Sequence, residues 1–205
     1  MNEQQRFHVP GGAATAPALA AGARAVVLVE GISDQAAVHA LAARRGRQLE
    51  AERIAVVPIG GAQAIARFLN LYGSQGLELR LAGLCDAGEE DDFRRGVERA
   101  GLGSDLTRAK MERLGFYVCV ADLEDELIRA VGVAGVKAIA ADHGDLGSFH
   151  TLQKQAAWRG RPEHEQLRRF MGSGGNRKVR YARLLVEALD LDRMPRPLDR
   201  VLAHV

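Results

Sequence analysis

Four short apolar runs, each followed by a segment with helical spacing, constrain the fold of this chain most strongly. The runs cover residues 25–29, 54–59, 79–85 and 116–121. Apolar runs of four to eight residues bounded by glycines or charges are typical of strands buried on both faces. A strand and a helix that alternate four times predict a parallel, doubly wound α/β sheet, because parallel neighbours need a crossover helix between them.

This alternation divides the chain into three parts. Residues 23–132 form the predicted α/β core, a mainly parallel four-stranded sheet with helices on both faces. Residues 1–22 are rich in Ala, Gly and Pro and are expected to be a flexible tail. Residues 133–205 are expected to be a helical C-terminal extension packed on the core. Ser33 is the expected N-cap of the first helix, and the last residues, with Pro195 and Pro197, are expected to run along the surface.

Carboxylates follow three of the four predicted strands. Glu30, Asp86 and Asp122 stand directly after the first, third and fourth runs. Further acidic side chains follow each of them, and those of interest are Asp34, Glu90 and Glu124. The carboxyl ends of parallel strands lie at one edge of a sheet, where ligands bind. Carboxylates gathered there repel one another and favour a hard divalent cation such as Mg²⁺, which prefers oxygen ligands.

A simpler interpretation exists for each acidic residue taken alone. Acidic side chains after a strand often cap the next helix or interact with its dipole, and this explains Asp91, Asp92 and Asp125 well. It is weaker for Glu30, because Gly31 and Ile32 still separate it from the expected cap. It is weakest for three strand ends considered together, so a metal site is the preferred interpretation.

Three stretches resemble the Toprim fold, which type IA and type II topoisomerases, bacterial primases and the overcoming lysogenization defect (OLD) nucleases share. They are VEGISD at 29–34, the Gly60-Gly61 turn and LCDAGEE at 84–90. The likeness is strongest to the OLD type, in which a V-E-G-x-S-D element, a short acidic motif ending in Leu-Glu and a later lysine occur. The corresponding residues here are Glu30 and Asp34, Asp122-Leu123-Glu124, and Lys178.

The resemblance implies a metal-dependent nuclease acting on DNA with two ions, Mg²⁺ or Mn²⁺. Glu30, Asp86, Glu124 and Lys178 would be catalytic, and the metal ligands would be Glu30, Asp34, Asp86, Glu90, Asp122 and Glu124. Toprim proteins usually carry Asp-x-Asp where this chain has Asp86-Ala87-Gly88, so Glu90 is expected to supply the missing carboxylate. Lys178 would neutralise charge in the transition state, although a simple contact to the phosphate backbone is an equal alternative.

Full-length OLD proteins also carry an ATPase domain, whereas this sequence contains no G-x-x-x-x-G-K-[ST] loop. A separate ATPase chain is therefore an expected partner, and self-association into a homo-oligomer stays open. The alternative function is a nucleic-acid-binding or regulatory Toprim module without catalysis. Topoisomerase or primase chemistry ranks lower, because neither a tyrosine placed as a nucleophile nor template-binding parts are evident.

Charge and cysteine content fit this interpretation. The net charge is only +2, but basic residues crowd residues 94–113 and 159–183 while acidic ones gather at the strand ends. The two cysteines lie inside predicted strands, where buried thiols suit a reducing compartment. No apolar run approaches the roughly 20 residues that span a bilayer. We therefore expect a cytoplasmic protein without membrane contact.

Overall fold

The computed structural model describes residues 22–205. The tail predicted over residues 1–22 therefore lies, apart from Gly22, outside the described residues. Within the described part, no helix is both long enough and apolar enough to cross a membrane.

The four predicted strands form one parallel sheet in the order β2-β1-β3-β4. The strands are β1 (Ala25–Val29), β2 (Ile54–Pro58), β3 (Arg80–Cys85) and β4 (Phe116–Val118). All five residues of β1 are fully buried, because β1 has a strand on each side and helices over both faces. The predicted doubly wound, parallel four-stranded α/β sheet is confirmed.

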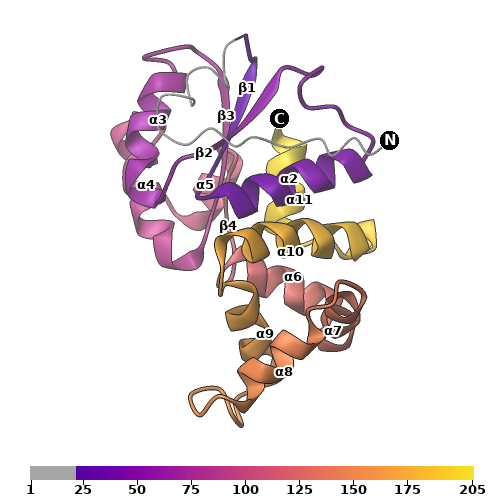
Figure 1. Ribbon diagram of the computed structural model, residues 1–205. Coiled ribbons are helices and arrows are strands. Elements are labelled where there is room, and N and C mark those ends of the chain that lie inside the picture. Colours follow the sequence, from indigo (N-terminus) through magenta and orange to yellow (C-terminus); the bar gives the residue numbers. More distant parts are fainter. Residues whose placement is uncertain (1–21) are drawn as a thin grey trace.

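Alternate residues of β1 serve two separate hydrophobic cores. Val26 and Leu28 face the first core, where the sheet is covered by three helices: α3 (Ile65–Tyr72), α4 (Glu90–Arg99) and α5 (Arg108–Arg113). Val27 and Val29 face the second. There the sheet is covered by α2 (Ile32–Arg44), α10 (Gly175–Ala188) and α11 (Arg196–His204), as Figure 1 shows. This is the period-2 alternation of a strand buried on both faces.

The remaining helices taper away below the carboxyl edge of the sheet (Figure 1). They are α6 (Leu123–Val131), α7 (Val133–Asp142), α8 (Leu146–Lys154) and α9 (Glu163–Met171). Short 3₁₀ turns at Ala62–Ala64, Ala87–Glu89 and Leu191–Arg193 complete the described elements. The rings of Phe149, Phe170 and Tyr181 meet edge to face, with centroids 5.5 and 6.0 Å apart along the series. They join α8, α9 and α10 into one packed unit.

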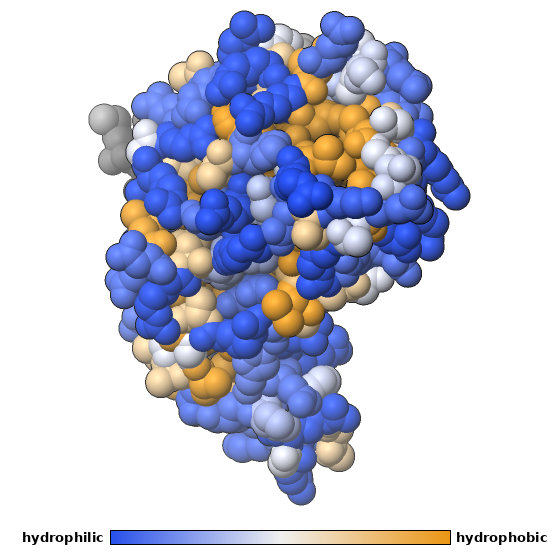
Figure 2. Space-filling view, turned by 180° about the vertical axis from the view of Figure 1, so that it is seen from behind, coloured by the Kyte–Doolittle hydropathy of each residue, from blue (hydrophilic) through white to orange (hydrophobic). Residues whose placement is uncertain are grey.

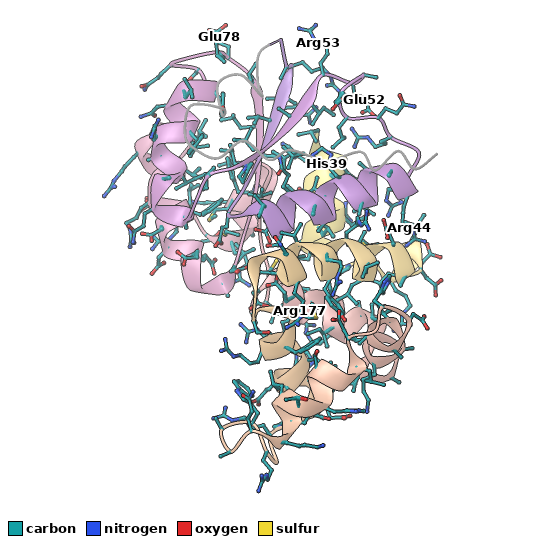
Figure 3. The ribbon with its side chains drawn as sticks, in the orientation of Figure 1. His39, Arg44, Glu52, Arg53, Glu78 and Arg177 are labelled. Carbon is teal, nitrogen blue, oxygen red and sulfur yellow. The ribbon has the colours of Figure 1, made fainter. Side chains whose placement is uncertain are left out.

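α10 then returns from this unit to the sheet and packs along α2. Arg44, labelled in Figure 3 at the end of α2, donates hydrogen bonds to the carbonyls of Val186 and Leu189 at the end of α10. These bonds satisfy carbonyls that a helix end leaves without an intrahelical partner. The two helices are therefore tied together at their C-terminal ends, and this places the N-terminal turn of α10 near the carboxyl edge of the sheet.

Two local expectations were wrong. The chain does not end along the surface: residues 196–204 form α11, whose Leu198, Val201 and Leu202 are buried against the second core. Pro197 does not prevent this helix, because a proline in the first turn lacks only an N–H that would have had no intrahelical partner. Ser33 is not the N-cap of α2 either, since the helix begins at Ile32 and Gly31 is its cap.

Candidate functional site

The carboxyl ends of β1 and β3 are joined through their acidic residues. The backbone N–H of Asp86 donates a 2.7 Å hydrogen bond to Oε1 of Glu30. Asp34, in the first turn of α2, accepts the N–H of Gly31 at 2.9 Å and is only 8% exposed. The VEGISD turn therefore holds Glu30 and Asp34 in place through backbone hydrogen bonds, beside the strand end that carries Asp86.

The end of β4 lies next to the same point. The N–H of Ala87 donates to the carbonyl of Ala121 at 2.9 Å, so the two loops beyond β3 and β4 run together. Asp122 is the N-cap of α6 and accepts the N–H of Asp125 at 2.8 Å. Glu124, on the first turn of α6, is only 4% exposed. Three strand ends thus contribute carboxylates to one edge of the sheet, as the parallel topology predicts.

Burial and mutual repulsion perturb these carboxylates. Burial first, and then the charges of Glu30, Asp34, Asp122 and Glu124, raise the pKa of Asp86 to about 8. Burial and the charge of Glu124 raise the pKa of Asp34 to about 6. The pKa values of Glu30 and Glu124 are also raised, mainly by burial. Ionised carboxylates are therefore costly here near neutral pH unless a cation offsets their charge.

Lys178, in the first turn of α10, is the cation that reaches into this group. Its Nζ lies 3.3 Å from Oε1 of Glu124, close enough for an ion pair but not aligned for a hydrogen bond. Burial alone would lower the pKa of Lys178, yet the charges of Glu124, Asp34 and Asp86 raise it overall. Oε1 of Glu124 is buried with no hydrogen-bond partner. A buried carboxylate oxygen left without one is a candidate for metal coordination.

Two predicted ligands have other partners. Glu90 forms an ion pair with Arg108. Its neighbour Glu89 is closer to the group, since burial, then the charge of Asp34 and then that of Glu89 raise the pKa of Glu30. Oδ2 of Asp122 accepts a 2.6 Å hydrogen bond from Nε of Arg168. Among the described residues, no three His, Cys, Asp or Glu side chains are arranged so that they could hold a metal ion. The assignments of Glu90 and Asp122 as ligands stay predictions.

Asp125 follows Glu124 directly in the sequence, but its side chain bonds to Arg129 and His164 rather than joining the acidic group. It accepts a hydrogen bond from Arg129 at 2.7 Å and lies 2.6 Å from Nε2 of His164 on α9. Burial tends to raise the pKa of Asp125, but the bonds to Arg129 and His164 lower it overall. This carboxylate therefore fastens α6 to α9, which agrees with its interpretation as a first-turn charge.

A groove that the sequence did not reveal opens beside Asp122 and Glu124. It has a volume of about 580 Å³ and is walled on its far side by residues of the helical extension. Its lining comprises Asp122, Glu124, Trp158, Arg161, Glu165, Arg168, Arg169, Gly172 and Lys178. The stretch 159–183 stood out as basic, but spacing alone could not place its arginines across from the acidic motif, because that depends on how α9 packs against α6.

Both cysteines are free and buried, as predicted. Burial, followed by nearby carboxylates, raises the pKa of the Cys85 and Cys119 thiols well above the usual range. The thiolate form that binds metals or acts as a nucleophile is therefore disfavoured at both positions. The candidate site at the carboxyl edge of the sheet therefore comprises the carboxylates and Lys178.

Comparison with known proteins agrees with the fold. Residues 23–87 match the family described as overcoming lysogenization defect protein-like, TOPRIM domain. The structure is similar to the C-terminal region of the Burkholderia pseudomallei OLD protein (TM-score 0.68, 20% identity, covering 89% of this chain and 96% of that one).

It is also similar to the C-terminal region of the Xanthomonas campestris pv. campestris OLD protein (TM-score 0.68, 25% identity, covering 89% and 92%). No curated protein sequence matches the chain significantly. The matched stretch contains the VEGISD turn, the Gly60-Gly61 turn and Asp86, the elements that build the β1 and β3 side of the acidic edge. Residues 23–87 of this chain thus match an OLD-like TOPRIM domain, and the chain has the fold of the C-terminal regions of OLD proteins.

Proposed function

We propose that the chain is a divalent-metal-dependent nuclease that hydrolyses phosphodiester bonds of DNA. The observation that carries this proposal is Asp86, at the end of β3, whose pKa is raised to about 8 by burial and by four other carboxylates from the ends of β1 and β4. Such crowding of acidic groups costs folding free energy unless cations bind. Strongly perturbed groups at a ligand-binding sheet edge are characteristic of functional sites.

The residues present suit Mg²⁺ or Mn²⁺. Both ions favour carboxylate oxygens, and the buried Oε1 of Glu124 has no hydrogen bond that such an ion would need to replace. Glu30 and Asp86 would hold one ion with Asp34 and either Glu90 or Glu89. Asp122 and Glu124 would hold a second. Divalent ions supply a nucleophilic water at neutral pH and stabilise charge on the attacking and leaving oxygens.

The chain's own residues contribute positioning and charge. Lys178 presents an ammonium group on the first turn of α10, where it would offset negative charge on the phosphoryl oxygens in the transition state. Glu124 orients this ammonium through their 3.3 Å contact. Glu30 orients the β3 end by accepting the Asp86 N–H. These contacts support roles for all four residues predicted as catalytic.

Cleavage of supercoiled plasmid tests the proposal. We expect nicking or linearisation with Mg²⁺ or Mn²⁺ and none with EDTA. Glu30→Gln is the informative variant, because an amide oxygen can still accept the Asp86 N–H while the negative charge is lost. Loss of cleavage with an unchanged circular dichroism spectrum would support a metal-ligand role. A pure protein that cleaves neither DNA nor RNA with any divalent ion would refute the proposal.

Two observations favour a second candidate, a nucleic-acid-binding module without catalysis. Arg168 and Lys178 already neutralise Asp122 and Glu124. Among residues 22–205, no group of three His, Cys, Asp or Glu side chains is arranged to hold a metal ion. Isothermal titration calorimetry with Mn²⁺ distinguishes the two candidates, since a nuclease must bind the ion and a binding module need not.

A separate ATPase chain remains a proposed partner, which co-purification from the native host would test.

A further inference from the structure

The groove beside Asp122 and Glu124 is lined by these two carboxylates in one part and by several arginines in another. Lys178 lies with the two carboxylates, whereas Arg161, Arg168 and Arg169 belong to α9 and the loop before it. Trp158 lines the same groove and is only partly buried. In the rear view of Figure 2, the tapering lower part of the molecule is predominantly hydrophilic. The helical extension thus continues the site with a charged wall rather than an apolar one.

Two of the three arginines of this wall, Arg161 and Arg169, are available to a ligand, whereas Arg168 is bonded to Asp122. Arg169 is exposed and, among the described residues, forms no ion pair. Arg161 donates a 2.9 Å hydrogen bond from Nε to the Ala157 carbonyl. Its ion pair with Glu165 spans 3.7 Å, and both side chains are more than half exposed. Its guanidinium also lies 5.0 Å from the centre of the Trp158 ring. Exposed ion pairs of this kind contribute little to stability, so a phosphate would displace them readily.

The basic stretch 94–113 includes two arginines that already have carboxylate partners. On α4, Arg94 pairs with Asp91 at 2.8 Å and Arg95 pairs with Asp92 at 2.5 Å. Each of these two arginines therefore has a carboxylate of its own helix next to it. Arg99 and Arg113, in the same basic stretch, are exposed and form no ion pair within residues 22–205, so free positive charge is present on both flanks.

From the lining of this groove we infer that it binds one strand of the nucleic acid next to the scissile phosphate, and that the strand leaves the site over α9. Arg161 and Arg169 contact backbone phosphates, and the Trp158 ring packs against a nucleoside. The inference rests on the proposed function and adds the direction of the bound strand and the residues that hold it. A cationic groove with an aromatic side chain is the usual means of holding a single strand without reading its sequence.

Binding of a fluorescein-labelled oligothymidylate tests the inference without cleavage, by anisotropy in EDTA and again in Ca²⁺ over a series of salt concentrations. Arg161→Gln/Arg169→Gln should weaken binding about 10-fold or more and lower the salt-dependence slope by about 1.4, or about 0.7 for each lost phosphate contact on a single strand. The matched control is Arg94→Gln/Arg95→Gln, which removes two arginines from the other flank and should change the dissociation constant less than about twofold.

Trp158 gives a direct second measurement, because it is the single tryptophan of the chain. Unlabelled oligothymidylate should quench the intrinsic fluorescence of the wild type, since a base stacked on the indole alters its emission. Trp158→Leu keeps apolar volume against the second core and should weaken binding about 10-fold with an unchanged salt slope, the signature of lost stacking. A melting temperature close to that of the wild type checks that the fold is retained.

Equal losses from the two arginine pairs, or a larger loss from the α4 pair, would overturn the inference, as would the absence of tryptophan quenching at saturation. If the wild type cleaves DNA while Arg161→Gln/Arg169→Gln and Trp158→Leu bind oligothymidylate with the wild-type dissociation constant, the inference alone is wrong. If the wild type neither binds nor cleaves nucleic acid with any metal, the proposed function fails first and the inference falls with it.

Discussion

Replacing Asp86 by asparagine should make the metal-free protein more stable at neutral pH, although it removes a residue proposed to be essential. Asp86 has a folded-state pKa of about 8, raised from 3.8 by burial and by Glu30 and the other carboxylates. An acid whose pKa is higher in the folded state is protonated there when the unfolded chain is already ionised. Its contribution to stability is intact below about pH 3.8 and is lost as the pH rises towards 8.

The size of the effect follows from that interval. At pH 7 the solution lies about three pH units above the unfolded-state pKa of Asp86 and still below its folded-state pKa. At 1.36 kcal/mol per unit, the loss in free energy of unfolding is at most roughly 4 kcal/mol. Asp86 is only half-buried and titrates together with its neighbours, so solvent screening reduces the figure to about 1–3 kcal/mol. Asparagine cannot ionise and escapes this penalty. For a chain of about 200 residues, the melting temperature should rise by about 3–10 °C.

Differential scanning fluorimetry in EDTA between pH 4.5 and 8.5 measures this directly. The gain of Asp86→Asn over the wild type should be small at pH 4.5 and should grow steadily with pH. Asp91→Asn is the matched control, because Asp91 is exposed and its bond to Arg94 lowers its pKa, so the variant should show no gain at any pH. A melting temperature for Asp86→Asn that falls below the wild type at pH 8, or a gain that does not depend on pH, would refute the proposed repulsion.

Three further predictions concern metal binding and catalysis. Mn²⁺ should raise the melting temperature of the wild type, more at pH 8 than at pH 6, and this rise should shrink in Glu124→Gln; an equal rise in both would exclude Glu124 as a ligand. Glu30→Ala and Glu124→Ala should each abolish plasmid cleavage, whereas Asp125→Ala should retain cleavage but melt at a lower temperature, because it loses its contacts to α9. Lys178→Ala should lower the single-turnover rate at saturating DNA by about 10²-fold with nearly unchanged affinity. A normal rate with weakened, less salt-dependent binding would make this lysine a backbone contact instead.

The strands and the acidic edge could be predicted because the signals are local. A run such as residues 25–29 is apolar at every position, which distinguishes a strand buried on both faces, and its end is marked by Glu30-Gly31. Parallel topology then requires that Glu30, Asp86 and Asp122 meet at one edge, whatever the details of packing. The match of residues 23–87 to the Toprim family reflects the same local elements.

The C-terminal helix could have been predicted from spacing. Leu198, Val201 and Leu202 repeat at i, i+3 and i+4, the pattern of one helical face, and Pro195 and Pro197 stand at its start rather than within it. Prolines alone favour an irregular surface segment, and only their position before the apolar residues distinguishes the start of a helix from its interruption. α11 therefore needs no long-range information to be expected.

Only the tertiary structure decided which charges meet across the helical extension. Asp122 and Arg168 are 46 residues apart and Glu124 and Lys178 are 54 apart, and no spacing rule connects either pair. Their contacts follow from how α9 and α10 pack through Phe149, Phe170 and Tyr181, which depends on side-chain shape over several helices at once. The sequence by itself therefore determined that carboxylates gather at the sheet edge, and tertiary packing alone determined which cations face them and where a groove opens beside them.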